Sequence, residues 1–215
     1  MRKLILAAFF ALGLTAVRAQ DTATYEEVIS QRTDGNMKDL GITDPVVYNR
    51  VKEVIMNHYF TLNDIYNERD SLLTVIKENP DGGWTREAVQ NQVDAKLYRH
   101  HFAFLSGLMI DLNEQQIETV KNALTYNVLN VTYTAQLDMI PSLTPAQKAQ
   151  IYAWLVEARE LAIDAGSSKE KHGVFGKYKG RINNYLSKEG YDLVKEREGW
   201  YERIKQREAE MEKHN

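Results

Sequence analysis

Residues 167–191 bring together the side chains of this sequence that are best suited to bind a negatively charged molecule. The segment carries six cations against two acidic residues, a net charge of +4, whereas the chain of 215 residues has a net charge of −3. The cations are Lys169, Lys171, Lys177, Lys179, Arg181 and Lys188, and the aromatic and amide residues among them are Phe175, Tyr178, Asn183, Asn184 and Tyr185. Such a concentration of positive charge in an acidic protein indicates a ligand site.

These side chains match the chemistry of an acidic sugar. The planar guanidinium of Arg181 can form two parallel hydrogen bonds with one carboxylate. Asn184 can donate and accept hydrogen bonds, Tyr178 and Tyr185 can stack on an apolar sugar face, and His172 can act as a general base. A nucleotide fits less well, because no glycine-rich phosphate-binding pattern follows a strand. The alternative interpretation is that the aromatic residues belong to the core and the lysines form a solvated rim.

Three carboxylates precede this segment at helical spacing. Glu157, Glu160 and Asp164 fall on one face of a helix, since residues three and four positions apart are neighbours. Paired carboxylates can perform acid–base chemistry when their environments differ. Alternatively, they form a solvated face that pairs with Lys169 or Lys171. The predicted ligand site comprises Lys171, His172, Lys177, Tyr178, Lys179, Arg181, Asn184 and Tyr185, with Asp164 and Glu160 beside them.

No motif in the sequence identifies a catalytic residue, a cofactor or a metal site. His100 and His101 are adjacent, and neighbouring side chains on a helix diverge by about 100°, so we do not expect both to bind one ion. The chain has no cysteine and no GxSxG nucleophile motif. Eliminative cleavage of a uronate stays an alternative, because Arg181 can neutralise the carboxylate while His172 or Tyr178 abstracts the adjacent proton.

The first 19 residues have the pattern of a secretory signal. Arg2 and Lys3 precede an apolar run over residues 4–17, and Ala19 ends a small-residue cleavage motif. The run is shorter than a membrane-spanning helix requires, and no later segment is apolar enough to cross a bilayer. We therefore expect a signal peptide over 1–19, a single domain over 20–215, and a periplasmic or secreted protein without stable membrane insertion.

Charge and cysteine usage narrow the function further. Removal of the signal leaves 24 basic and 30 acidic residues. This acidic balance argues against general nucleic-acid binding, which needs widespread positive potential. An exported chain without cysteine must be stabilised by packing rather than by disulfides, and it has no thiol for lipid attachment after the signal.

The apolar residues recur at helical spacing, and no alternation is long enough for a strand. We predict a short helix over 24–32, a long helix that starts at Pro45 after the capping residue Asp44, and a third helix from Thr85. Capping patterns at 112–117 and 143–147 begin two further helices. Residues 125–137, rich in β-branched side chains, are a weaker helix, and residues 192–213 form a charged C-terminal helix. The predicted architecture is an all-α bundle of five to seven helices with one long N-terminal helix.

The stretch GSSKEKHGVFGKYKGRINNYLSKEGYDL, residues 166–193, resembles a family of uncharacterised secreted bacterial proteins, as do residues 143–147 and 154–164. With the long helix, the resemblance covers nearly all of the chain after the signal. It implies a role in polysaccharide use and brings no catalytic residues. A weaker likeness is to the periplasmic LTxxQ proteins, which are helical stress chaperones. Residues 143–147 carry their motif, whereas residues 112–116 have Asn in place of Thr.

Together these observations favour an exported helical protein that binds an acidic oligosaccharide, or another small anion, through residues 169–185. Its role would be accessory to glycan use. Two alternatives stay open: a lyase or hydrolase that uses the same basic pocket, and an LTxxQ-like chaperone. We predict no cofactor, no metal and no nucleic-acid partner.

Overall fold

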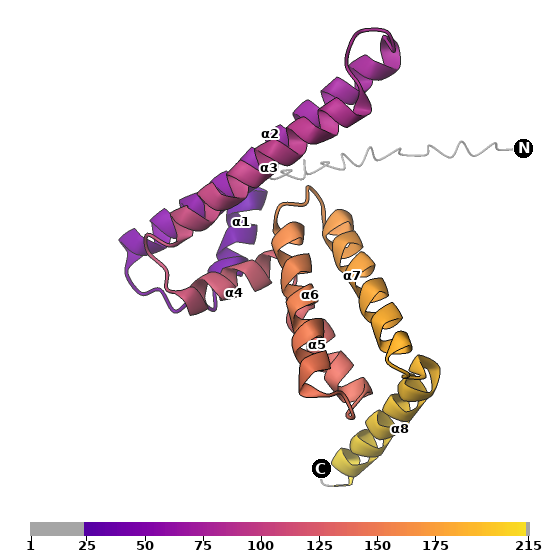
Figure 1. Cartoon of the computed structure of the whole chain (residues 1–215). Coiled ribbons are helices and arrows are strands. Elements are labelled where there is room, and N and C mark those ends of the chain that lie inside the picture. Colours follow the sequence, from indigo (N-terminus) through magenta and orange to yellow (C-terminus); the bar gives the residue numbers. More distant parts are fainter. Residues whose placement is uncertain (1–23, 214–215) are drawn as a thin grey trace, which may run out of the picture.

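The computed structural model describes residues 24–213 and confirms that this part of the chain is all-helical (Figure 1). Its eight helices are α1 (Tyr25–Met37), α2 (Pro45–Glu78), α3 (Arg86–Leu108), α4 (Glu114–Leu124), α5 (Val128–Met139), α6 (Pro145–Ile163), α7 (Ser168–Lys188) and α8 (Leu193–Glu212). Within that range, no helix has both the length and the apolar character needed to cross a bilayer. The predicted signal over 1–19 lies outside the described residues.

Two details of the predicted fold need correction. The count exceeds five to seven because the basic segment is itself a regular helix, α7. Phe175, Ile182 and Leu186 are buried along one side of α7, and burial of such a stripe is what stabilises an amphipathic helix. The longest helix, α2 with 34 residues, is not the N-terminal element, because the predicted short helix, α1, precedes it.

The predicted capping residues begin the helices as expected. The Asp44 side chain accepts hydrogen bonds from the first turn of α2, and Pro45 occupies its first position. Asn113 with Gln116 at α4, and Thr144 with Gln147 at α6, form complete capping boxes. Each such cap contributes about 1 kcal/mol, so these starts are set by local sequence.

The first half of the fold is built on the long antiparallel pair α2 and α3. The far end of this hairpin projects beyond the other helices, while α1 and α4 pack near its opposite end (Figure 1). Val51, Ile55, Phe104, Leu108 and Val120 are among the buried residues of this core.

Helix α6 joins this half to the second one. Its last residue, Ile163, is buried in the first core, whereas Leu155 lies in a second core with Leu129 of α5 and Ile182 of α7. The corner between α6 and α7 therefore lies where the two cores meet, close to α2 (Figure 1). This corner positions the candidate site.

Candidate functional site

A cavity of about 400 Å³ lies between α1, α2 and the α6–α7 corner. We call it the tyrosine-lined cavity, because Tyr25, Tyr59, Tyr66 and Tyr126 contribute to its wall. Its cations are Arg32, Arg69 and Lys171, its amides are Asn63 and Asn67, and its carboxylates are Asp70 and Glu170. Aromatic rings, amides and charges in one hollow are typical of a site for a polar small molecule.

Two of the rings are held rigidly. The Tyr66 hydroxyl donates to the Asp164 carbonyl oxygen at 2.8 Å, which ties α2 to the α6–α7 corner. The Tyr59 hydroxyl accepts a hydrogen bond from Asn36 Nδ2 at 3.0 Å, which ties α2 to α1. Burial raises the pKa of Tyr66 to about 12 and also raises the pKa of Tyr59. Both phenols are therefore neutral at physiological pH and serve as hydrogen-bonding, stacking groups.

The two arginines of the cavity differ in their partners. Arg69 lies over the Tyr66 ring at 4.6 Å and pairs with Asp70 at 2.8 Å and Glu170 at 3.8 Å. Arg32 lies 5.6 Å from the centre of the Tyr59 ring. Among the residues from 24 to 213, no carboxylate forms an ion pair with Arg32. Arg32 is therefore the cation of the cavity that is open to an anionic ligand.

Lys171 caps the ends of two helices. Its side chain is 6% exposed, and its Nζ donates to the Leu124 carbonyl oxygen at 2.9 Å and to the Ile163 carbonyl oxygen at 3.3 Å. Leu124 and Ile163 are the last residues of α4 and α6, where carbonyl groups lack helical partners and cations are favoured. Desolvation lowers the pKa of Lys171 to about 8. Its positive charge thus lines the cavity from a fixed position.

Gly166 allows the corner to approach Tyr66 closely. A Cβ atom at Gly166 would lie 2.7 Å from Cδ2 of Tyr66, closer than side-chain atoms pack. The absence of a side chain lets the backbone of the α6–α7 corner lie against the ring. This contact fixes one wall of the cavity.

Tyr126 is held at the cavity in an unusual backbone conformation. Its φ is +57°, and that of Asn127 is +55°, in the left-handed region that bulky residues rarely adopt. Its ring stacks on His172, with ring centres 5.3 Å apart and planes inclined by 14°. His172, predicted as a ligand residue, therefore supports the cavity wall through Tyr126.

The remaining predicted residues of α7 are not gathered in this cavity. Lys177, Lys179, Arg181 and Asn184 are exposed, while Tyr178 and Tyr185 are half-buried against the second core. Arg181 pairs with Glu157 at 3.4 Å and lies 4.7 Å from the Trp154 ring. Lys179 lines a separate hollow with Trp200. Because α7 is a regular helix, its cations point in several directions.

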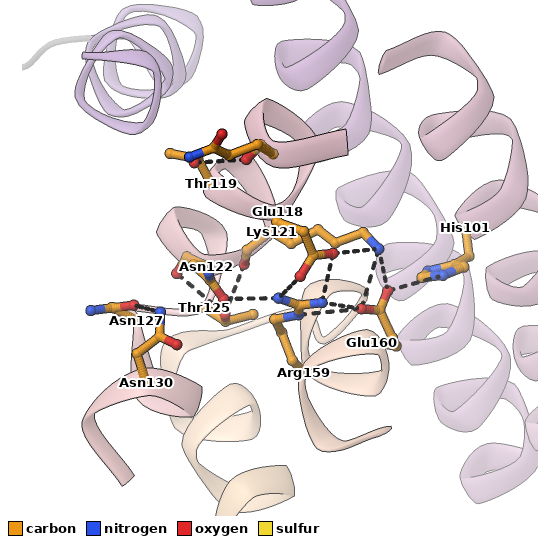
Figure 2. Close-up of polar contacts among 11 residues, drawn as sticks. His101, Glu118, Thr119, Lys121, Asn122, Thr125, Asn127, Asn130, Arg159 and Glu160 are labelled. Carbon is orange, nitrogen blue, oxygen red and sulfur yellow. Dashed lines mark hydrogen bonds and ion pairs between the residues drawn. The ribbon is translucent and has the colours of Figure 1, made fainter. Parts of the chain in front are cut away.

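Glu160 and Asp164 face α3 and α4 instead of the basic segment. Figure 2 shows Glu160 between Arg159, Lys121 and His101. Arg159 is 2% exposed and donates to Glu118 at 2.6 and 2.9 Å. Glu160 and Asp164 therefore pair with side chains of α3, α4 and α6. They do not pair with the lysines 169 and 171, which the sequence suggested as partners. The network joins α3, α4 and α6.

A histidine pair lies beside the same corner. His58 Nδ1 is 2.9 Å from His100 Nε2, and His58 Nε2 is 3.3 Å from the Ile163 carbonyl oxygen. Because the carbonyl accepts, His58 carries its proton on Nε2 and accepts from His100. His101 points elsewhere, with Nδ1 2.8 Å from Asp164 Oδ2, so the predicted divergence of His100 and His101 is confirmed. Within residues 24–213, no group of three or more His, Asp or Glu side chains is arranged so that it could hold a metal ion.

Sequence reasoning missed most of the tyrosine-lined cavity. Tyr25 and Arg32 come from α1, Tyr59 and Tyr66 from α2, and Tyr126 from the α4–α5 connection. No short motif joins positions so far apart. A signal was present at Lys171, which precedes Phe175 by four residues and so belongs to the buried side of α7.

The chain belongs to the DUF3826 family of proteins of unknown function, whose sequence model matches residues 26–206. No curated protein matches it. The match confirms the resemblance to an uncharacterised family. It does not bear on polysaccharide use or on the LTxxQ proteins, which both stay predictions.

Proposed function

We propose that this protein binds a small acidic saccharide in the tyrosine-lined cavity, as an exported accessory to glycan use. The observation that carries the proposal is the position of Arg32, an arginine without a carboxylate partner in the described chain, beside tyrosine rings and two amides. Rings stack on the apolar faces of sugars, amides bind hydroxyls, and a guanidinium binds a carboxylate. The volume of about 400 Å³ lies within the range of small-molecule sites.

The charge balance of the cavity supports an acidic rather than a neutral ligand. Asp70 and Glu170 both pair with Arg69, whose single charge offsets one of their two negative charges. With Arg32 and Lys171 included, three cations face two carboxylates, a net charge of +1 in the cavity, and the N-terminus of α7 at Ser168 adds a partial positive charge. A uronate carboxylate beside Arg32 would give this arginine the anionic partner that it lacks in the described chain.

The exposed face of α7 is the competing location for the same ligand. Lys177, Lys179 and Arg181 are accessible there and raise the positive potential near the cavity. They lack a shared hollow with the tyrosines that line the cavity, so we assign them to long-range attraction of the anion. The two roles, ligand contact by the cavity residues and long-range attraction by the exposed cations of α7, can be separated by mutation.

Calorimetric titration with trigalacturonate, and with the neutral xylotriose as comparison, tests the proposal. We expect the acidic sugar to bind and the neutral one to bind at least about tenfold more weakly, because one charged hydrogen-bond pair contributes about 1.5–3 kcal/mol. Arg32→Gln should reduce affinity for trigalacturonate by about tenfold or more. Arg181→Gln, which removes the same charge from exposed α7, should change it by less than about threefold.

Two results would overturn the proposal. One is the absence of heat or saturation with trigalacturonate up to about 10 mM. The other is the reverse mutational pattern, in which Arg181→Gln abolishes binding and Arg32→Gln has no effect, since that would move the site to the outer face of α7.

A further inference from the structure

A second hollow, of about 450 Å³, lies between α3 and α6. We call it the α3–α6 groove. Its apolar wall is made by Leu97, Tyr98, Phe102 and Leu161. Tyr98, Phe102 and Leu161 are 68%, 52% and 55% exposed, although they are large apolar side chains. The Tyr98 and Phe102 rings meet edge to face with their centres 4.9 Å apart, so they present a shaped aromatic surface to solvent.

The polar part of the α3–α6 groove is acidic. Its charged members are Asp94, Glu160 and Asp164, with His101 between the last two, and no lysine or arginine is among its lining residues. Glu160 is neutralised from behind by Lys121 and Arg159. The groove is therefore opposite in charge to the tyrosine-lined cavity.

Two carboxylates of this groove keep unused acceptor capacity. Asp94 accepts a hydrogen bond from Gln90 Nε2 at 2.8 Å, and no lysine or arginine of residues 24–213 forms an ion pair with it. Asp164 is only 9% exposed, and its Oδ2 is held by His101 Nδ1. Its Oδ1 is buried and has no hydrogen-bond partner in the described part of the chain. An unsatisfied buried carboxylate oxygen is costly and favours a donor from a ligand.

We propose that the α3–α6 groove binds an organic amine in its ammonium form. The ammonium would lie toward Asp94 and Asp164, whose acceptors it can satisfy. Its apolar body would cover Phe102 and Leu161, and the faces of Tyr98 and Phe102 would add cation–π stabilisation. An acidic sugar is excluded here by the same carboxylates, so this site and the tyrosine-lined cavity take different ligands and neither proposal depends on the other.

Three probes of one shape test the charge requirement. Phenethylammonium, 2-phenylethanol and 3-phenylpropionate are titrated into the protein at neutral pH, with binding followed by calorimetry and by NMR shifts of α3 and α6. We expect the ammonium to saturate the protein in the millimolar range or below, and the alcohol to bind about tenfold more weakly. The carboxylate should not bind.

Surface variants locate the site without endangering the fold. Phe102→Ala and Asp94→Asn change exposed side chains, and each should weaken ammonium binding by about two- to fivefold. Tyr201→Ala and Asp39→Asn remove an exposed aromatic and an exposed charge elsewhere, and both should leave the affinity unchanged. Equal affinity for ammonium and alcohol, no saturation up to about 10 mM, or no effect of Phe102→Ala would overturn the proposal.

Discussion

At the scale of single residues, two buried side chains share the carbonyl oxygen of Ile163. Lys171 reaches it from α7 at 3.3 Å, and His58 reaches it from α2 at 3.3 Å. Tyr66 binds the next carbonyl, that of Asp164. The carbonyl groups at the buried end of α6 are thus satisfied by side chains of two other helices. These contacts fix the corner that closes the tyrosine-lined cavity.

Part of this could be predicted from the sequence. Lys171 is separated from Phe175 by four residues and from Ile182 by eleven, so helical periodicity alone places it on the buried side. His58 likewise follows Ile55 and precedes Leu62 in the buried stripe of α2. The carbonyl oxygens that accept from Lys171 and His58 belong to the ends of α4 and α6. Which helix ends pack there is decided by the tertiary structure, and no local sequence pattern predicts it.

We predict that Gly166→Ala destabilises the protein by about 1–3 kcal/mol, because the new methyl group overlaps the Tyr66 ring and must displace it. Gly176→Ala is the matched control. A Cβ atom at Gly176, inside α7, meets no atom within 4 Å. It should stabilise the helix by about 0.5–1 kcal/mol. Urea denaturation measures both, and equal effects of the two substitutions would contradict the close contact at Gly166.

At the scale of helices, local signals succeeded where the determining residues are neighbours. The starts of α2, α4 and α6 were predicted because a cap and its partner lie within four residues. The segment 168–188 was harder to interpret. Its many cations suggested a binding surface. The apolar residues between these cations, however, form a buried stripe that packs α7 against the second core.

The LTxxQ-like motif has a structural part in this arrangement. Thr144 and Gln147 form the capping box of α6. The Gln147 side chain also accepts a hydrogen bond from the Tyr191 hydroxyl at 2.8 Å and donates to Glu189 at 3.1 Å. The motif therefore connects the start of α6 with the region after α7, and chaperone activity stays a prediction.

We predict that Arg159→Met destabilises the protein by about 3 kcal/mol, because it removes a buried guanidinium and leaves Glu118 and Glu160 with fewer partners (Figure 2). Arg181→Met breaks an ion pair between two half-exposed side chains, Arg181 and Glu157, and should cost less than about 1 kcal/mol. Denaturation midpoints in urea compare the two variants. If Arg159→Met lost no more stability than Arg181→Met, the network that joins α4 to α6 would contribute little to stability.

At the scale of the whole molecule, the tyrosine-lined cavity joins elements far apart in the sequence. Its wall extends from Tyr25 in α1 to Lys171 in α7. Sequence composition indicated the basic segment, and α7 begins at this cavity, but composition could not find the contributions of α1 and α2. These depend on how the α6–α7 corner packs against the long hairpin.

The molecule should lose stability as the pH falls below about 6.5. Burial lowers the pKa of His58 from 6.5 to about 3 and also lowers the pKa of His100. Below pH 6.5 the unfolded chain therefore binds protons that the native state does not bind, and the free energy of unfolding falls by up to about 1.4 kcal/mol per pH unit through His58, with His100 acting in the same direction. The pKa of His101 is raised by its bond to Asp164, which acts in the opposite direction.

His58→Gln tests this account, because glutamine can still donate to Ile163 but does not titrate. Between pH 6.5 and 5, the native protein should lose about 2 kcal/mol more than this variant. Urea denaturation at several pH values measures the difference. If His58→Gln kept the native pH dependence, burial of His58 would not be its source.

The most direct test of the central claim is a crystal structure of the protein with trigalacturonate. We predict a sugar ring against the tyrosines of α1 and α2, with one carboxylate bound by the Arg32 guanidinium. Saccharide density along the outer face of α7, beside Lys177 and Arg181, or a cavity that stays empty at saturating ligand, would contradict the account.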